Sequence, residues 1–202
     1  MPEEDKSLDR RSATSQPVPL SVGFVNTRHA VRGRLHDVIA TPGQLGVWLH
    51  QQAAVPGLID FRADMPNCVA GGELAAFHDL RAAIGTLFRA AAEQRIPPPD
   101  ALAHINDTAL LARSAPALVA HGLRYALVER GLLTGLPAAR GVIARDAVHV
   151  LAGEPGLHAC HGPGCVLLFV THDARRRWCS AGCGNRARAA RHYDRQREHR
   201  SG

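Results

Sequence analysis

Four of the five cysteines in this 202-residue chain gather near its carboxyl end. Cys160 and Cys165 form one close pair, and Cys179 and Cys183 form a second pair after a short intervening segment. Two such pairs can supply the four thiolates of a tetrahedral zinc site, each pair from one turn of chain. Because the protein fills every position, we expect one structural Zn²⁺ per chain and no open site for catalysis. Buried thiols clustered by chance are the alternative, and this number and spacing of ligands make it the weaker one.

An arginine-rich segment follows the second cysteine pair. Residues 160–202 contain nine arginines against three acidic residues, while the rest of the chain has no net charge. A basic module of this kind is typical of a protein that binds a polyanion, and arginine suits phosphate and guanine contacts. The candidate nucleic-acid contacts are Arg175, Arg176, Arg177, Arg186, Arg188, Arg191 and Arg195.

The arginine segment has helical periodicity. At 100° per residue, Ala189, Ala190 and Tyr193 share one arc, and Arg188, Arg191 and Arg195 lie opposite. We expect the first set to pack on the zinc site and the arginines to face outward. A solvated charged face without a partner is the alternative, but such a face normally mixes acidic residues with basic ones.

These residues resemble a known family. The cysteine pairs, the intervening Arg176-Arg-Trp-Cys-Ser180, the Cys183-Gly-Asn-Arg186 motif and Ala190-Arg-His-Tyr193 are similar to the CGNR zinc finger over about residues 157–197. In that family the finger follows a domain called ABATE, named for stress-induced transcription regulators, and Phe24-Val-Asn-Thr27 resembles the opening of that domain. The resemblance implies zinc at the four cysteines, DNA binding by the finger and a bacterial transcriptional regulator that responds to stress. The loop between the pairs is shorter here than in many members.

Helices dominate the expected organisation. We expect a disordered tail over residues 1–19, a mainly helical domain over 20–153 and a small α+β zinc module, with a knuckle, a short hairpin and a helix, over 154–202. Thr41-Pro-Gly-Gln44 predicts a capping box, and apolar periodicity predicts helices over about 73–95 and 138–151. Asp100 is expected to cap a further helix, and a hairpin turning at His121-Gly122 is one interpretation of the segment after it.

The helical domain carries no sequence signature of catalysis. No nucleophile and base pair, paired carboxylates or open metal set stands out, so we expect no enzyme. Asn26 and Thr27 are candidates for a ligand pocket with Arg28 or His29 beside them, or else they make only turn and capping hydrogen bonds. Cys68 is most simply an idle thiol and not a redox sensor.

The whole-chain expectation is a regulator in which the helical domain senses a small-molecule effector or forms a homodimer while the finger binds DNA. A zinc-stabilised module that binds RNA or an acidic protein is the alternative. Residues 1–19 are polar and no segment approaches the roughly 18 apolar residues of a membrane span, so we expect a soluble, cytoplasmic protein without a membrane partner. Substitution of Cys179 or Cys183 by serine is expected to unfold the zinc module and spare the helical domain.

Overall fold

A body of packed helices carries one extension at each end. The computed structural model describes residues 18–31, 33–52, 55, 69, 71–153 and 156–201. The helices are α1 (Leu20–Val25), α2 (Pro42–Gln51), α3 (Gly71–Ala92), α4 (Pro99–Ala109), the short 3₁₀ helix η2 (Leu110–Ala112), α5 (Gly135–Ala152) and α6 (Ala181–Ser201). The strands are β1 (Arg28–Val31), β2 (Arg34–Asp37), β3 (Ser114–His121), β4 (Arg124–Gly131), β5 (Gly156–Ala159) and β6 (Leu168–Thr171).

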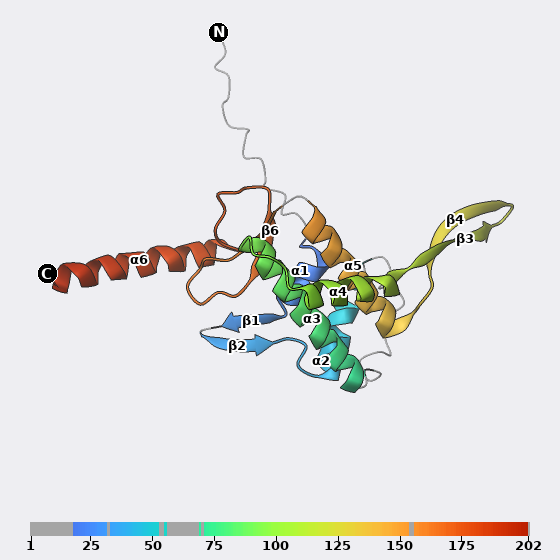
Figure 1. Cartoon of the computed structure of the whole chain (residues 1–202), viewed down its shortest axis with the longest axis horizontal. Coiled ribbons are helices and arrows are strands. Elements are labelled where there is room, and N and C mark those ends of the chain that lie inside the picture. The colour runs from blue at the N-terminus through green and yellow to red at the C-terminus, as the bar shows by residue number, and fades with distance from the viewer. Residues whose placement is uncertain are drawn as a thin grey trace, which may run out of the picture.

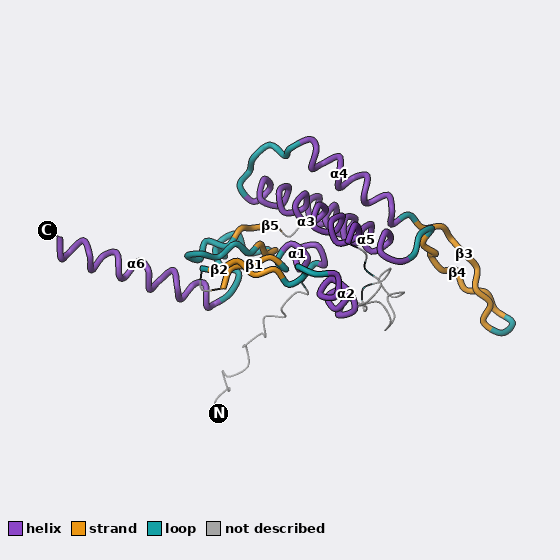
Figure 2. Tube along the Cα trace, turned by 90° about the horizontal axis from the view of Figure 1, so that it is seen from below, coloured by secondary structure: helices purple, strands orange, loops and turns teal. Residues whose placement is uncertain are grey.

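The expected fold class, mainly α with short antiparallel hairpins, is confirmed. The strands pair as β1–β2, β3–β4 and β5–β6. Figure 1 shows the β3–β4 hairpin and α6 projecting from opposite ends of the helical body, and Figure 2 shows the same separation from below. Helices α3, α4 and α5 pack against one another, and α1 contacts both α3 and α5.

Sequence patterns predicted several elements correctly. The Thr41 side chain accepts from the Gln44 N–H while the Gln44 side chain accepts from the Thr41 N–H, which is the capping box of α2. Helices α3 and α5 occupy the predicted periodic segments. The β3–β4 hairpin turns at Gly122, whose φ of 61° is a conformation that glycine adopts without strain.

Other expectations were incomplete or wrong. Asp100 lies in the first turn of α4, after the N-cap residue Pro98, and its side chain makes no capping bond. Periodicity did not assign residues 20–27 to helix or strand, and they form α1 and the turn that leads to β1. Cys68 and nearly all of the expected tail lie outside the described residues.

The zinc module contacts the helical body through its hairpin. Leu168 of β6 is 2% exposed and belongs to the main hydrophobic core, against which Leu157 and Val170 also pack. Strand β5 contacts α3, and β6 contacts α1. Within the described part of the chain, no helix combines the length and apolar character that a membrane crossing requires.

Candidate metal centre and basic helix

The four expected cysteines meet at one point. Their sulfur atoms all lie within 4.8 Å of one another, with Cys165 Sγ 3.9 Å and Cys183 Sγ 3.4 Å from Cys179 Sγ. Four sulfurs bound to one zinc at about 2.3 Å would lie about 3.8 Å apart, so the cluster has the size of a tetrahedral Zn(Cys)₄ site. The four cysteines are therefore positioned to bind one metal ion, and the donor set is that of a structural Zn²⁺.

Backbone amides and one guanidinium point at the sulfur atoms. The N–H groups of Gly162 and Cys179 donate to Cys160 Sγ at 3.5 and 3.3 Å, and Arg186 Nη2 lies 3.1 Å from Cys183 Sγ. Donors of this kind stabilise thiolates and orient metal ligands. A Cβ on Gly162 would lie 2.9 Å from the Cβ of Cys183, so the knuckle needs glycine there to close on α6.

The thiols differ in acidity. Burial raises the pKa of the Cys165 and Cys179 thiols. Burial also opposes ionisation of Cys183, but hydrogen bonds from Ser180 and Cys179 outweigh it and lower its pKa to about 7. Metal binding must therefore displace protons from the less acidic thiols, which links zinc affinity to pH.

A small apolar cluster supports the site. Phe169 is buried beside Cys160 and Cys183, and Trp178 packs against the same cluster. The ring of Trp178 lies over Gly184, where an added Cβ would come within 3.3 Å. Trp178 is thus a packing residue of the metal site.

The structure corrects the predicted packing face of the basic helix. Tyr193 is 66% exposed and Ala189 is exposed, so neither packs on the zinc site. Ala187 and Ala190 instead line a small groove with His161, Pro163 and Trp178. Helix α6 continues beyond the module after these residues, so Tyr193 has no surface to pack on (Figure 1).

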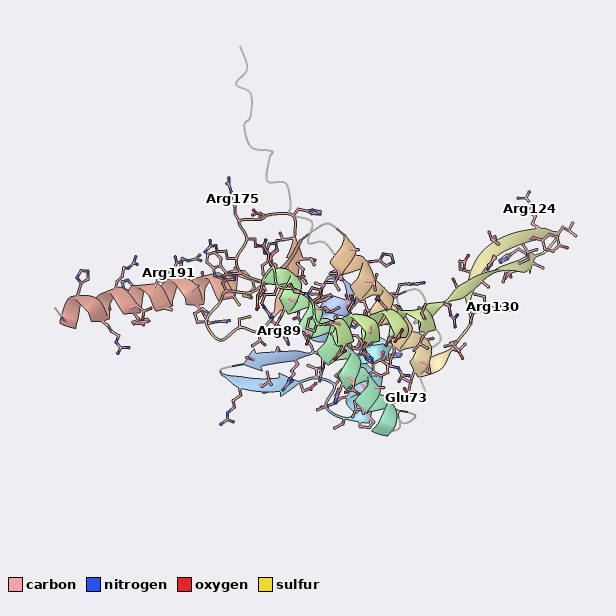
Figure 3. The ribbon with its side chains drawn as sticks, viewed as in Figure 1. Glu73, Arg89, Arg124, Arg130, Arg175 and Arg191 are labelled. Atoms are coloured by element: carbon pink, nitrogen blue, oxygen red, sulfur yellow. The ribbon has the colours of Figure 1, made fainter. Side chains whose placement is uncertain are left out.

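The candidate arginines fall into two groups. Arg176 donates to the carbonyl oxygens of Trp178 and Cys179 and lies over the Phe169 ring at 5.1 Å, while Arg186 contacts the Cys183 thiol. The first group therefore braces the metal site. The second group is exposed on α6 or on the loop before it, as Figure 3 shows for Arg175 and Arg191, and consists of Arg175, Arg177, Arg188, Arg191 and Arg195.

Asn26 and Thr27 lie between the helical body and the zinc module. The Asn26 carboxamide bonds to both backbone groups of Leu168, and the Thr27 hydroxyl donates to the Phe24 carbonyl and accepts from Arg81. Arg81 is buried and forms a bidentate pair with Asp37, whose pKa is lowered chiefly by this hydrogen bond. The bond from Thr27 to Phe24 is a local turn bond of the expected kind, whereas Asn26 bonds to a residue far away in the sequence. A role of the two residues in a ligand pocket stays a prediction.

A cavity of about 800 Å³ lies beside them. Its wall comes from the β1–β2 hairpin, from α3 and from residues 159, 160 and 165–168 of the zinc module, and includes Val25, Arg28, His36, Arg89 and Leu168. Arg28 was expected only as a neighbour of a pocket, and Arg81 and Arg89 were not expected there. Arg81 could have been found, because it interrupts the apolar face of α3 between Phe77 and Ile84.

Two family models match the chain in succession. The ABATE model, described as a putative stress-induced transcription regulator, matches residues 19–154, and the CGNR zinc finger model matches residues 157–196. No curated protein matches the chain at a significant level. Neither description is that of an enzyme. The match to ABATE covers most of the chain, so the protein belongs to the ABATE family of putative stress-induced transcription regulators and carries a CGNR zinc finger.

Proposed function

We propose that the chain is a DNA-binding transcription regulator that responds to stress, with residues 20–153 as its sensing or dimerising domain and 154–202 as its DNA-binding finger. The observation that carries the proposal is the exposed group of arginines on α6, a helix whose first turns are held by the metal centre. Its 21 residues extend about 30 Å, and the major groove of DNA admits an α-helix.

The electrostatics of α6 support contact with phosphate. Arg188, Arg191 and Arg195 are all exposed, and Asp194 is the one acidic residue on the helix whose side chain the structure describes. A Zn(Cys)₄ centre carries about −2, and Arg186 beside Cys183 offsets part of that charge. The outer turns of α6 therefore present positive charge.

A salt series measures whether these arginines contact DNA. Affinity for duplex DNA should fall with salt by about 0.9 log units of binding constant per log unit of salt for each phosphate contact. Replacing Arg188, Arg191 and Arg195 by alanine should reduce that slope by roughly 3. The matched control removes three exposed arginines elsewhere, Arg34, Arg113 and Arg145, and should leave the slope unchanged.

The same assay separates the alternative function. If the finger is an RNA- or protein-interaction module, single-stranded RNA or an acidic peptide will compete for the zinc-loaded protein better than duplex DNA does. If the α6 triple variant and the control triple variant lose equal affinity for DNA, α6 is rejected as the contact surface, because net charge alone would then account for binding.

We also propose that the cavity between the helical body and the zinc module binds a small anionic effector. Arg28 and Arg89 line it, and neither guanidinium has a hydrogen-bond or ion-pair partner among the described residues. A Cβ added to Gly85 would lie 3.4 Å from both Arg89 Nη2 and Val25 Cγ1, so the Arg89 guanidinium lies beside the apolar side chain of Val25. The volume is that of a site for a small organic molecule.

An anionic fluorophore tests this second proposal. We expect 8-anilinonaphthalene-1-sulfonate to bind the native protein, and Arg89→Met to weaken binding by roughly ten-fold or more, as loss of a charge-assisted contact does. Arg34→Met, an exposed arginine outside the cavity, is the control. Equal affinities in the two variants would exclude Arg89 as an effector contact.

A further inference from the structure

The β3–β4 hairpin carries several exposed apolar side chains that pack against nothing else in the described structure. Its two strands pair with each other and project from the helical body (Figures 1 and 2). Leu118, Tyr125 and Leu127 are 70–78% exposed, and Leu123 at the tip is fully exposed. A lone two-stranded ribbon is only marginally stable in water, so a third strand or a packed layer would stabilise it.

Both faces of the ribbon are apolar along its middle. Residues directly opposite each other on antiparallel strands project to the same face. One face carries the pairs Leu118–Leu127 and Ala120–Tyr125, and the other carries Ala117–Val128 and Val119–Ala126. The charged residues lie toward the two ends of the ribbon. Arg124 is at the tip, and Glu129 and Arg130 are near the helical body. A nucleic-acid ribbon would carry its basic residues along a face, so this pattern favours a protein partner.

The two edges of the ribbon differ. The Leu132 N–H donates to the Arg113 carbonyl at 2.9 Å, so Arg113 and Leu132 form a hydrogen-bonded pair at the base of the ribbon. Hydrogen-bonded and non-hydrogen-bonded pairs alternate along an antiparallel ribbon. Counting from Arg113–Leu132, the non-hydrogen-bonded pairs are Pro116–Glu129, Leu118–Leu127 and Ala120–Tyr125, and their backbone N–H and C=O groups point away from the partner strand. Pro116 has no N–H, so the outer edge of β3 is interrupted. The outer edge of β4 is complete at Tyr125, Leu127 and Glu129.

From this asymmetry we infer that β4 is a self-association edge, which pairs antiparallel with β4 of a second copy to form a four-stranded sheet. Antiparallel pairing of two identical strands obeys two-fold symmetry, so each copy satisfies the edge of the other. Pro116 removes one N–H from the outer edge of β3, which disfavours the addition of a further strand there and favours an assembly of two chains. The Tyr125 and Leu127 side chains of both copies then form one continuous apolar face.

The inference specifies the homodimer within the proposed function, but it stands on its own observations. If the DNA proposal also holds, the two α6 helices would lie at the outer ends of the dimer, because α6 and the hairpin leave the body at opposite ends (Figure 1). Such a dimer would use two well-separated DNA half-sites.

A pair of proline variants tests the edge directly. Leu127→Pro removes an outward N–H from β4 and leaves the bonds to β3 intact, while Leu118→Pro makes the same change on the other member of the same cross-strand pair. Sedimentation equilibrium of the full-length zinc protein should give a dimer for the native chain. Leu127→Pro should raise its dissociation constant by roughly ten-fold or more, and Leu118→Pro should change it much less.

Three results would overturn the inference. The first is a native chain that stays monomeric up to about 100 μM. The second is a dimer that both variants weaken equally or that neither weakens, while circular dichroism shows both to be folded. The third is a monomer in which Arg124→Ala weakens DNA binding, which would assign the hairpin to nucleic acid instead. Because sedimentation requires no DNA, failure of the DNA proposal would not affect this test.

Discussion

The carboxamide of Asn26 occupies the place that a neighbouring strand would take beside β6. It donates to the Leu168 carbonyl at 2.8 Å and accepts from the Leu168 N–H at 3.0 Å, so it satisfies both backbone groups of a residue in the core. The sequence identified Asn26 as a polar residue of interest. Its partner lies 142 positions away, and no local pattern relates the two.

Replacement of Asn26 by alanine should destabilise the protein. The backbone N–H and C=O of buried Leu168 would lose their partner, which costs about 1–3 kcal/mol for each group that remains unsatisfied. Urea unfolding of Asn26→Ala against Asn106→Ala, the same change at an exposed position of α4, measures the difference. If the two variants lose equal stability, the Asn26 bonds contribute nothing.

Among elements, helices with a strong local signal and the β3–β4 hairpin were predictable, and the β1–β2 hairpin was not. The box at Thr41 and the apolar repeat of α3 need only neighbours within a turn or two. The β1–β2 hairpin was missed because its strands have four residues each and show no apolar alternation. The pair between Asp37 on β2 and Arg81 on α3 anchors it, and this contact is visible only in three dimensions.

Helix α6 shows a second limit of periodicity. The helical wheel predicted that Ala189, Ala190 and Tyr193 pack on the zinc module and that the arginines face away from it. In the structure Ala189 and Tyr193 are exposed, and Arg191 lines the groove beside Ala190. From α6, Ala187, Ala190 and Arg191 line the groove, whereas Tyr193, further along the helix, is exposed. Periodicity predicts that a helix is amphipathic, but it does not fix where a small neighbouring module touches it or how far that neighbour extends along the axis. The metal ligands were predictable because zinc chemistry fixes ligand type and number.

At the scale of the whole molecule, the zinc module and the helical body share one hydrophobic core. Leu168 belongs to the main cluster, and Leu157, Ala159 and Val170 pack against it. Strands β5 and β6 also form one wall of the cavity between the two parts. The metal centre therefore supports more than the arginine helix, because the hairpin that it holds completes the packing of α1 and α3.

This shared core revises the expectation that loss of a cysteine spares the helical domain. A metal at about 1,000 times its dissociation constant contributes about 4 kcal/mol to the state that binds it. Removal of zinc should release β5 and β6, expose the core at Leu168 and lower the thermal stability of the helices as well. The expected result is a single unfolding transition by circular dichroism that moves to lower temperature after chelation and in Cys179→Ser.

The control is Cys68→Ser, which removes a thiol outside the metal set and should keep both the zinc and the transition of the native chain. The opposite result, helices that unfold at an unchanged temperature after zinc is removed, would mean that β5 and β6 add nothing to the core that they contact.

The Asn26→Ala variant distinguishes two ways in which the zinc module can stabilise the helical body. If chelation shifts its transition as far as that of the native chain, apolar packing at Leu168 couples the module to the body. A smaller shift would assign that coupling to the Asn26 hydrogen bonds.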